Sequence, residues 1–193
     1  MRWASGRTVV VFVALLIGCA SPAPDRPVDI TYAHLPPIAV DVRTIEVISA
    51  YANVATAPHV ETRLATPPNE VMLRWGRERL RAQGVSGSVR FTVQNAPLTE
   101  EPLPKQRGFL GAFTIEPGDR YTLTVDGQLE VLDDSGQRLA IASARVTQTG
   151  TLKEGATPEE RQAFWLRLTR LAMDAFNAQM ESAIRQHLQA WVR

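Results

Sequence analysis

The side chain best suited to covalent chemistry in this 193-residue chain is its single cysteine, Cys19. It follows the apolar residues Leu15–Ile17 and Gly18, and it precedes a stretch rich in proline. A single cysteine cannot form an intramolecular disulfide, which excludes a disulfide-stabilised scaffold. Three uses remain open for this residue: a thioether to lipid, a free exposed thiol, and a disulfide to another chain.

The residues before Cys19 have the organisation of a secretory signal peptide. Arg2 and Arg7 supply a positive head, and the run Val9–Ile17 is wholly apolar. At about nine residues the run is far shorter than the ~20 residues of a membrane-spanning helix. A charged head, a short apolar run and a small residue at the cleavage site predict a signal peptide over residues 1–18. The alternative, an N-terminal core helix or strand, fits poorly with the flanking arginines and the prolines that follow.

The stretch Leu16-Ile17-Gly18-Cys19 resembles the lipobox of bacterial lipoproteins. The resemblance implies that the Cys19 sulfur receives a diacylglyceryl group, that the chain is cut before Cys19, and that the new amino group is acylated. Two or three acyl chains, at ~0.8 kcal/mol per buried methylene, give stable membrane anchoring. Ala20 stands where an aspartate retains enteric lipoproteins in the inner membrane. By this resemblance we expect the periplasmic face of the outer membrane, with the inner membrane as the alternative.

Length and charge limit what the mature chain can be. Residues 19–193 have the length of one domain. Removal of Arg2 and Arg7 leaves 21 − 2 = 19 Lys and Arg against 20 Asp and Glu. A chain so nearly neutral gives no reason to expect binding to nucleic acid. Five prolines between residues 20 and 37 predict an extended, lipidated tether over residues 19–37, ahead of a single domain over 38–193.

The domain has four segments with the pattern of strands. The clearest is 120–132, in which Tyr121 to Val131 alternate strictly between apolar and polar side chains. A turn at Gly136 leads to a strand over 138–150, whose even-numbered face carries small residues from Ala140 to Val146. The remaining two strands are expected at 88–95 and at 38–49, the latter with a bulge at Arg43–Thr44.

Two helices complete the expected fold. The first begins with Thr66 as N-cap and Pro67 as first helical residue, and Gly84 closes it. The second begins at a capping box around Thr157 and runs as far as Val192. The order is β-α-β-β-β-α. We therefore expect an α+β two-layer sandwich, in which a four-stranded, mainly antiparallel sheet carries both helices on one face.

This order, on a lipidated chain of this size, resembles two groups of periplasmic lipoproteins. One is the auxiliary lipoprotein family of ABC-type transport systems, to which VISAYANVATAPHVETR and the following helix with Trp75 are similar. The other is the lipoprotein that plugs the lipopolysaccharide-export barrel. The resemblance implies a non-catalytic protein that takes part in lipid traffic between membranes. No functional residue carries over from either group.

The sequence has no recognisable catalytic or metal-binding motif. His34, His59 and His187 lack the spacing of metal ligands, and a zinc site needs three or four convergent ligands. No nucleophile elbow or phosphate-binding loop is present. We therefore expect no enzyme, no cofactor and no metal. In the loop 50–65, Tyr51, His59 and Arg63 are nevertheless able to line a site.

Two features suit binding. The long loop 96–119 has an apolar centre, and Phe109, Leu110 and Phe113 are candidate contacts to a partner protein or lipid. These side chains can instead fold back on the core or extend the neighbouring strands as a hairpin.

Arg74, Arg77 and Arg81 share one face of the first expected helix and are candidate contacts to an anionic lipid or lipid A phosphate. The competing interpretation is a solvated basic face, with Glu78 paired to Arg74 or Arg81.

Together these features predict a periplasm-facing, membrane-anchored lipoprotein that is a non-catalytic accessory or binding component of an envelope complex. Lipid or lipopolysaccharide transport is the process that the resemblance implies. The expected partners are the membrane, through the lipid anchor, and an envelope protein or lipid. The alternative is a purely structural lipoprotein that supports a protein assembly, and the third is a periplasmic enzyme whose catalytic groups converge from distant segments.

Overall fold

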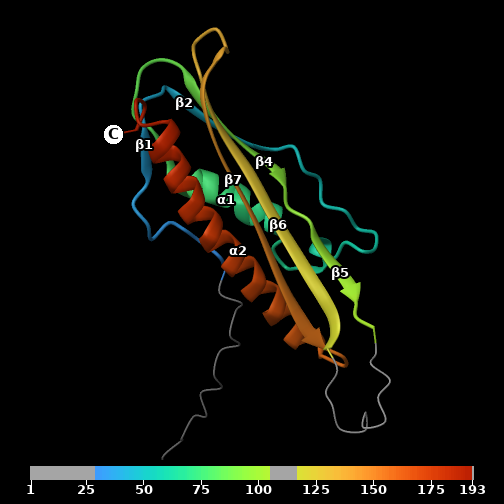
Figure 1. Cartoon of the computed structure of the whole chain (residues 1–193). Coiled ribbons are helices and arrows are strands. Elements are labelled where there is room, and N and C mark those ends of the chain that lie inside the picture. The colour runs from blue at the N-terminus through green and yellow to red at the C-terminus, as the bar shows by residue number, and fades with distance from the viewer. Residues whose placement is uncertain (1–28, 105–116, 193) are drawn as a thin grey trace, which may run out of the picture.

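The structure, a computed structural model, describes residues 29–104 and 117–192 (Figure 1). A long twisted sheet forms one layer and two helices form the other. The chain is therefore of the α+β class, as the sequence predicts. The described elements are β1 (Ile38–Val40), β2 (Thr44–Ser49), the 3-10 turn η1 (Glu61–Arg63), α1 (Pro68–Arg79), β3 (Leu80–Ala82), β4 (Ser88–Asn95), β5 (Leu98–Pro102), β6 (Pro117–Leu132), β7 (Arg138–Lys153) and α2 (Pro158–His187).

The main sheet has five strands rather than the expected four. β6 is antiparallel to β7 on one side; on the other, its N-terminal part pairs with β5 and its C-terminal part with β4. β4 and β5 thus lie end to end along β6, separated by Ala96-Pro97. Proline has no backbone N–H for a ladder, so a strand that reaches Pro97 is interrupted there. The expected long loop 96–119 therefore contains a strand, β5.

β2 completes the main sheet at its other side. It pairs with β4 in parallel, whereas all other pairs in this sheet are antiparallel. Within the residues that the structure describes, β2 pairs with no further strand, so it is an edge strand.

The single strand expected over 38–49 is in fact two strands in different sheets. β1 pairs in parallel with β3 in a separate two-stranded sheet, and only β2 joins the main sheet. The expected bulge at Arg43–Thr44 is the place where the chain passes from one sheet to the other. Gly84 is needed here for close packing, because a Cβ on it would lie 2.5 Å from the carbonyl carbon of Asp41.

α1 begins and ends differently from the expectation. Its N-cap is Pro67 and its first residue is Pro68, one position later than expected. It ends at Arg79, because Leu80 becomes extended and pairs with Ile38 in the two-stranded sheet. Gly84 therefore does not close the helix.

α2 has the predicted capping box, in which Thr157 and Glu160 bond each other's backbone N–H groups. It ends at His187, five residues before the expected end at Val192. Its last turn is followed by a short return of the chain, in which the Trp191 carbonyl accepts a hydrogen bond from the Asp41 N–H at 2.7 Å.

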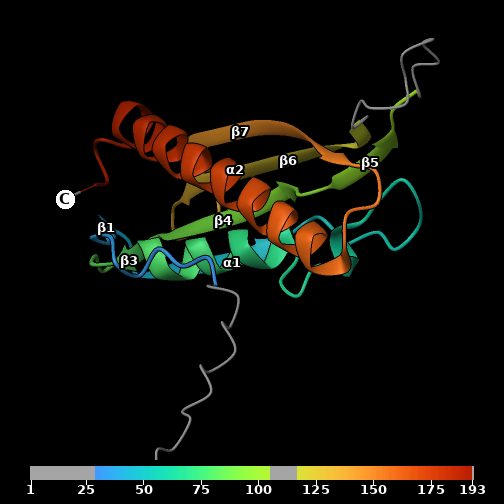
Figure 2. The same cartoon turned by 90° about the horizontal axis from the view of Figure 1, so that it is seen from below.

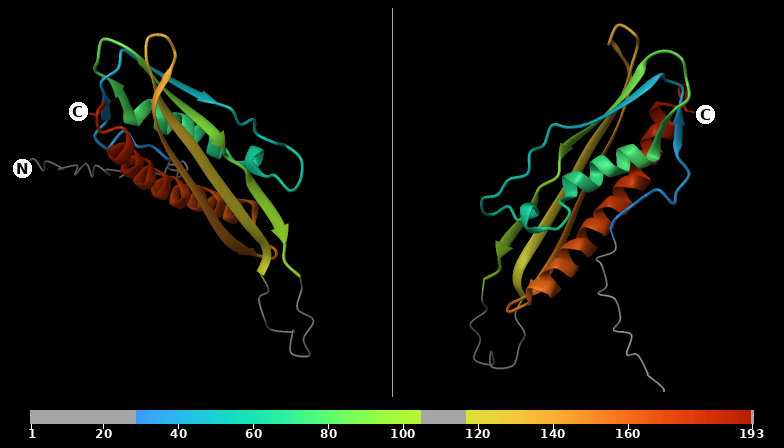
Figure 3. Two further views of the ribbon diagram at one scale, coloured as in Figure 1. Left: turned by 45° about the horizontal axis from the view of Figure 1, so that its top comes forward. Right: turned by 180° about the vertical axis from the view of Figure 1, so that it is seen from behind.

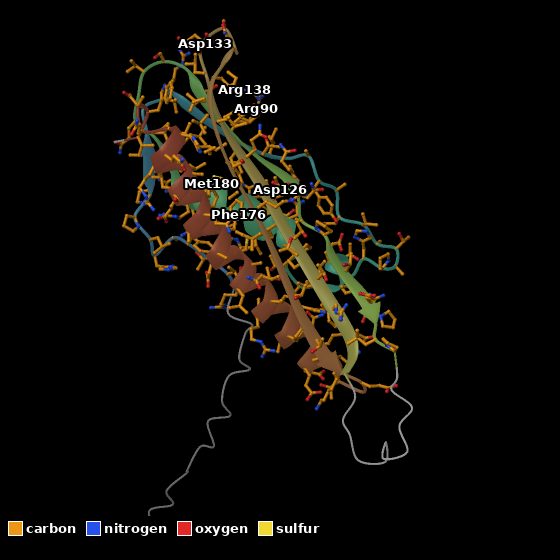
Figure 4. All side chains as sticks on the ribbon, viewed as in Figure 1. Arg90, Asp126, Asp133, Arg138, Phe176 and Met180 are labelled. Carbon is orange, nitrogen blue, oxygen red and sulfur yellow. The ribbon has the colours of Figure 1, made fainter. Side chains whose placement is uncertain are left out.

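Both helices cover the same face of the sheet, as predicted (Figure 2). Phe91 of β4 contacts both of them, since its ring centroid lies 5.1 Å from that of Trp75 in α1 and 6.3 Å from that of Phe176 in α2. The expected small face of β7 is also confirmed, since Ala142, Ala144 and Val146 are buried beneath α2. Figure 4 labels Phe176 and Met180, two fully buried side chains of α2.

The other face of the sheet is mainly polar, apart from the exposed Ile48, Leu139 and Ile141, and it carries charges that are paired across strands. Arg90 bonds Glu46 at 2.7 Å, and Arg138 bonds Glu130 at 3.0 Å. Figure 4 labels Arg90 and Arg138, together with Asp126, which pairs with a β7 arginine at 3.3 Å. These cross-strand pairs balance opposite charges on the described part of the open face.

Candidate functional site

The N-terminal residues 29–37, which we call the strap, belong to the folded domain. The expected tether over 19–37 is therefore too long at its C-terminal end. Ile30 and Tyr32 are each 4% exposed and lie in the hydrophobic core. The Tyr32 hydroxyl donates to Asp174 of α2 at 2.8 Å, and the Tyr32 N–H donates to Glu78 of α1 at 2.5 Å. The strap is thus fastened to both helices.

The strap also explains why Arg74 differs from the other two arginines that were expected to share its helix face. Arg74 pairs with Asp29 at 2.5 Å and donates to the Ile30 carbonyl at 3.2 Å. Glu78, expected to pair with an arginine, instead accepts hydrogen bonds from Thr31 and Tyr32. Arg74 therefore holds the strap and is not available as the anion contact that the sequence predicted.

Arg77 and Arg81 remain exposed, but they lie on different elements. Arg77 is on the last turn of α1, whereas Arg81 is in β3 and not on the helix as expected. Neither guanidinium has a hydrogen bond or ion pair with any part of the chain that the structure describes. By contrast, the neighbouring Arg79 is 3% exposed and pairs with Glu181 of α2.

The two exposed arginines line a hollow of about 280 Å³ at the edge of the sandwich. Its walls come from β2 on one side and from α1 and β3 on the other. Figure 3 (right) shows from behind how α1 lies against the sheet. The lining residues are Ile45, Val47, Gly76, Arg77, Leu80, Arg81 and Ala82. The hollow is open to solvent, and it brings the apolar side chains of Ile45, Val47 and Ala82 beside two cations.

The hollow exists because α1 packs closely on β2 where β2 has no outer neighbour. A Cβ on Gly76 would lie 3.0 Å from Val47 and 2.8 Å from Phe91, so only a glycine permits this approach. Ile45 and Val47 point toward α1 and are only half-buried, because no further strand covers them. The geometry suits a ligand that brings apolar groups and at least one negative charge.

A second polar cluster surrounds Glu61, which is fully buried. Its carboxylate accepts hydrogen bonds from the Tyr51 hydroxyl, from the Val54 N–H at 3.0 Å and from the Leu98 N–H at 3.4 Å. His59 Nδ1 lies 3.2 Å from the same carboxylate. Burial alone raises the pKa of Glu61, but these hydrogen bonds outweigh it and hold the pKa below its usual value.

Tyr51 and His59 both contact Glu61. They are two of the three loop residues that the sequence analysis named as able to line a site. Burial and the bond to Glu61 raise the pKa of the Tyr51 hydroxyl, so it remains a proton donor. The third residue, Arg63, lies instead 3.6 Å from Glu100 of β5. The Glu61 cluster joins the loop 50–65 to the start of β5, which gives it a clear structural role.

The other sequence-based candidates lie outside the described residues. These are the lipid-attachment residue Cys19 and the apolar loop residues Phe109, Leu110 and Phe113. The residues that sequence reasoning missed are Ile45, Val47, Leu80 and Ala82 of the hollow, and Glu61. The slip in alternation at Arg43–Thr44 was the available signal for the hollow, because it marks where β2 begins as a separate edge strand.

Residues 29–104 and 117–192 contain no group of three or more His, Cys, Asp or Glu that could hold a metal ion. In the same residues, no helix has the length and apolar character needed to cross a membrane. Comparison with known proteins found no matching family model and no matching curated protein.

Proposed function

We propose that this protein is a lipid-anchored accessory component of an envelope assembly, held at the periplasmic face of the outer membrane. Its task is to bind another component of that assembly and not to catalyse a reaction. Lipid or lipopolysaccharide transport is the process we propose for the assembly, on the resemblance of the β-α-β-β-β-α order and the lipobox to lipoproteins of such systems. The observation that carries the binding role is the hollow beside Arg77 and Arg81.

Arg77 and Arg81 support this role because their charges are available to a ligand. Within the described residues neither has an ion pair, whereas the nearby Arg74 and Arg79 both have carboxylate partners. Two guanidiniums beside a few apolar side chains form a site that is complementary to an anionic, partly apolar ligand. At about 280 Å³ the hollow lies just below the range of about 300–1,000 Å³ that is common for ligand sites.

The position of the strap limits how far the domain would lie from the proposed lipid anchor. Nine residues, 20–28, separate Cys19 from Asp29. An extended chain spans at most about 3.3–3.6 Å per residue, so a lipidated Cys19 stays within roughly 35 Å of Asp29. Asp29 bonds Arg74, and Arg77 is one turn further along α1. The proposed anchor thus keeps the helical layer and its hollow close to the membrane.

The anchor is tested by labelling growing cells with radioactive palmitate. We expect the label and membrane fractionation in the wild-type protein, and loss of both in Cys19→Ala. Label that persists in Cys19→Ala would contradict lipidation at this residue.

The binding role is tested separately in intact cells with a photoreactive residue at Ala82, which is exposed and lines the hollow. We expect one defined protein or lipid to be captured. The matched control carries the label at Ser143, which is exposed on the polar face of β7. Identical products at Ala82 and Ser143 would contradict a specific role for the hollow. A third label at Phe109 tests whether the loop 96–119 contacts the same partner.

A further inference from the structure

β2 has the properties of a strand that accepts a further strand. Its sequence, TIEVIS, is rich in β-branched residues, and it pairs only with β4 within the described residues. An edge strand presents a row of backbone N–H and C=O groups on its outer side. Its side chains are also incompletely covered, since Ile48 is 37% exposed and Ile45 and Val47 are half-buried.

The hollow lies where the inward side chains of an added strand would go. It is bounded by the helix-facing side chains of β2, and by Leu80, Arg81 and Ala82 opposite them. A strand placed beside β2 would direct alternate side chains into this space, because side chains alternate across a strand. Apolar side chains there would complete the burial of Ile45 and Val47.

We propose that β2 binds an extended, acidic segment of a partner protein, which adds to the main sheet as a further strand. Backbone hydrogen bonds to β2 supply affinity, apolar side chains fill the hollow, and one or two carboxylates pair with Arg77 and Arg81. This inference rests on the proposed function, in which the protein binds another component of an assembly. It adds the chemistry of that component and the place where it binds.

Charge and hydrogen bonding favour this occupant over two others. A lipid would pair with the arginines, but its acyl chain has no groups to satisfy the outer N–H and C=O groups of β2. A second copy of β2 carries one carboxylate, Glu46, which is directed to the polar face and already bonds Arg90 at 2.7 Å. A second copy that paired its own β2 here would therefore bring no free carboxylate from that strand to Arg77 and Arg81, whereas an acidic segment of a partner would.

The test begins by panning a random dodecapeptide phage library against the full chain in detergent. Enriched peptides are synthesised with a fluorescent label, and their Kd is measured by fluorescence anisotropy. We expect an enriched family that alternates apolar residues and contains at least one Asp or Glu. Hydrogen exchange of the amides of Thr44–Ser49 should slow at least tenfold when the peptide is bound.

Variants then test the two arginines. In R77E/R81E the Kd should rise at least tenfold, because two attractions become repulsions. Ala82→Glu should weaken binding several-fold as well, since it places a carboxylate of the chain itself beside the arginines. The matched control R167E/R185E changes the same net charge on the exposed face of α2 and should leave the Kd unchanged. All of these positions are exposed, and thermal unfolding checks that each variant is folded.

Three outcomes would overturn the proposal. The first is that no peptide family is enriched above a detergent-only control, or that the peptides bind R77E/R81E as tightly as wild type. The second is that phosphatidylglycerol vesicles, and not peptides, slow exchange in Thr44–Ser49, which would make the hollow a lipid site. The third is that light scattering shows a dimer of the chain without peptide, and that the amides of Thr44–Ser49 are already protected from hydrogen exchange in that dimer. The proposed function is judged by palmitate labelling of Cys19 and by capture of any defined protein or lipid from Ala82, neither of which requires an acidic strand, so failure here is distinguishable from failure of the proposed function.

Discussion

Gly76 offers a test of how tightly α1 is packed on the sheet, because two effects of known size oppose each other there. In the interior of a helix, alanine is favoured over glycine by about 0.8–1.0 kcal/mol. Gly76→Ala would therefore stabilise the protein if the helix were unconstrained. The new Cβ, however, would lie 2.8 Å from Phe91 Cδ1 and 3.0 Å from Val47 Cγ1, both closer than ordinary van der Waals contact.

The packing cost should exceed the gain in helix propensity. Overpacking of a well-packed core costs typically about 1–3 kcal/mol. The Phe91 ring cannot easily move away, because Trp75 and Phe176 hold it at ring-centroid distances of 5.1 and 6.3 Å. Subtracting a propensity gain of about 1 kcal/mol leaves a net loss of about 0–2 kcal/mol. For a domain of this size, each kcal/mol lowers Tm by about 2–4 °C.

Urea unfolding followed by circular dichroism measures this difference directly. Val47→Ala removes two of the three close contacts, because both Val47 methyl groups lie within 3.3 Å of the added Cβ. The double variant should therefore show a favourable coupling of at least about 0.5 kcal/mol relative to the sum of the single variants. A Gly76→Ala protein that is more stable by about 1 kcal/mol, with no coupling to Val47, would refute the close approach of α1 to β2.

Three further changes have expected outcomes. Glu61→Gln should lower the free energy of unfolding by about 1–3 kcal/mol, because it leaves buried donors poorly paired. The pKa of Glu61 is depressed in the folded protein, so the advantage of the wild type should be present above the ordinary pKa of 4.5 and be lost as pH falls through the folded value. Urea titrations at several pH values measure this dependence. Thr157→Ala should lower stability by about 0.5–2 kcal/mol through loss of the α2 cap, and an unchanged Tm would contradict this role. Arg79→Met should cost about 1–3 kcal/mol, because it removes the hydrogen bonds of a buried guanidinium to Glu181, Asn177 and the Pro36 carbonyl. Glu181 keeps Asn177 and Arg185 as partners, so chemical denaturation should show that adding Glu181→Gln to Arg79→Met costs less than Glu181→Gln alone.

The sequence analysis correctly predicted the elements that are specified by side-chain alternation or capping residues within the element itself. The alternation over 120–132 gave β6 to within three residues, and the small face beginning at Ala140 correctly predicted where α2 packs. The Thr157 capping box gave the start of α2 without error. These features depend on hydrogen bonds and side-chain periods within a few neighbouring residues, which is why sequence alone sufficed.

The errors arose where a distant segment decided the outcome. Residues 29–37 have the composition of a tether, yet Ile30 and Tyr32 are buried because α1 and α2 provide both an apolar surface and the carboxylates of Glu78 and Asp174. Likewise, the residue Leu80 looks helical in sequence but becomes extended because Ile38 offers it a backbone partner. Tertiary contacts of this kind override local propensity.

By itself the sequence determined the α+β class, the order of the principal elements and the lipobox-like stretch at Cys19. Only the tertiary structure decided which of the three helix-region arginines have partners. Arg74 is neutralised by Asp29, 45 positions away in the chain, whereas Arg77 and Arg81 come from two elements that meet at an open sheet edge. A site built from β2, α1 and β3 has no signature in any one segment, because the distances that create it are set by packing between segments and not by spacing along the chain.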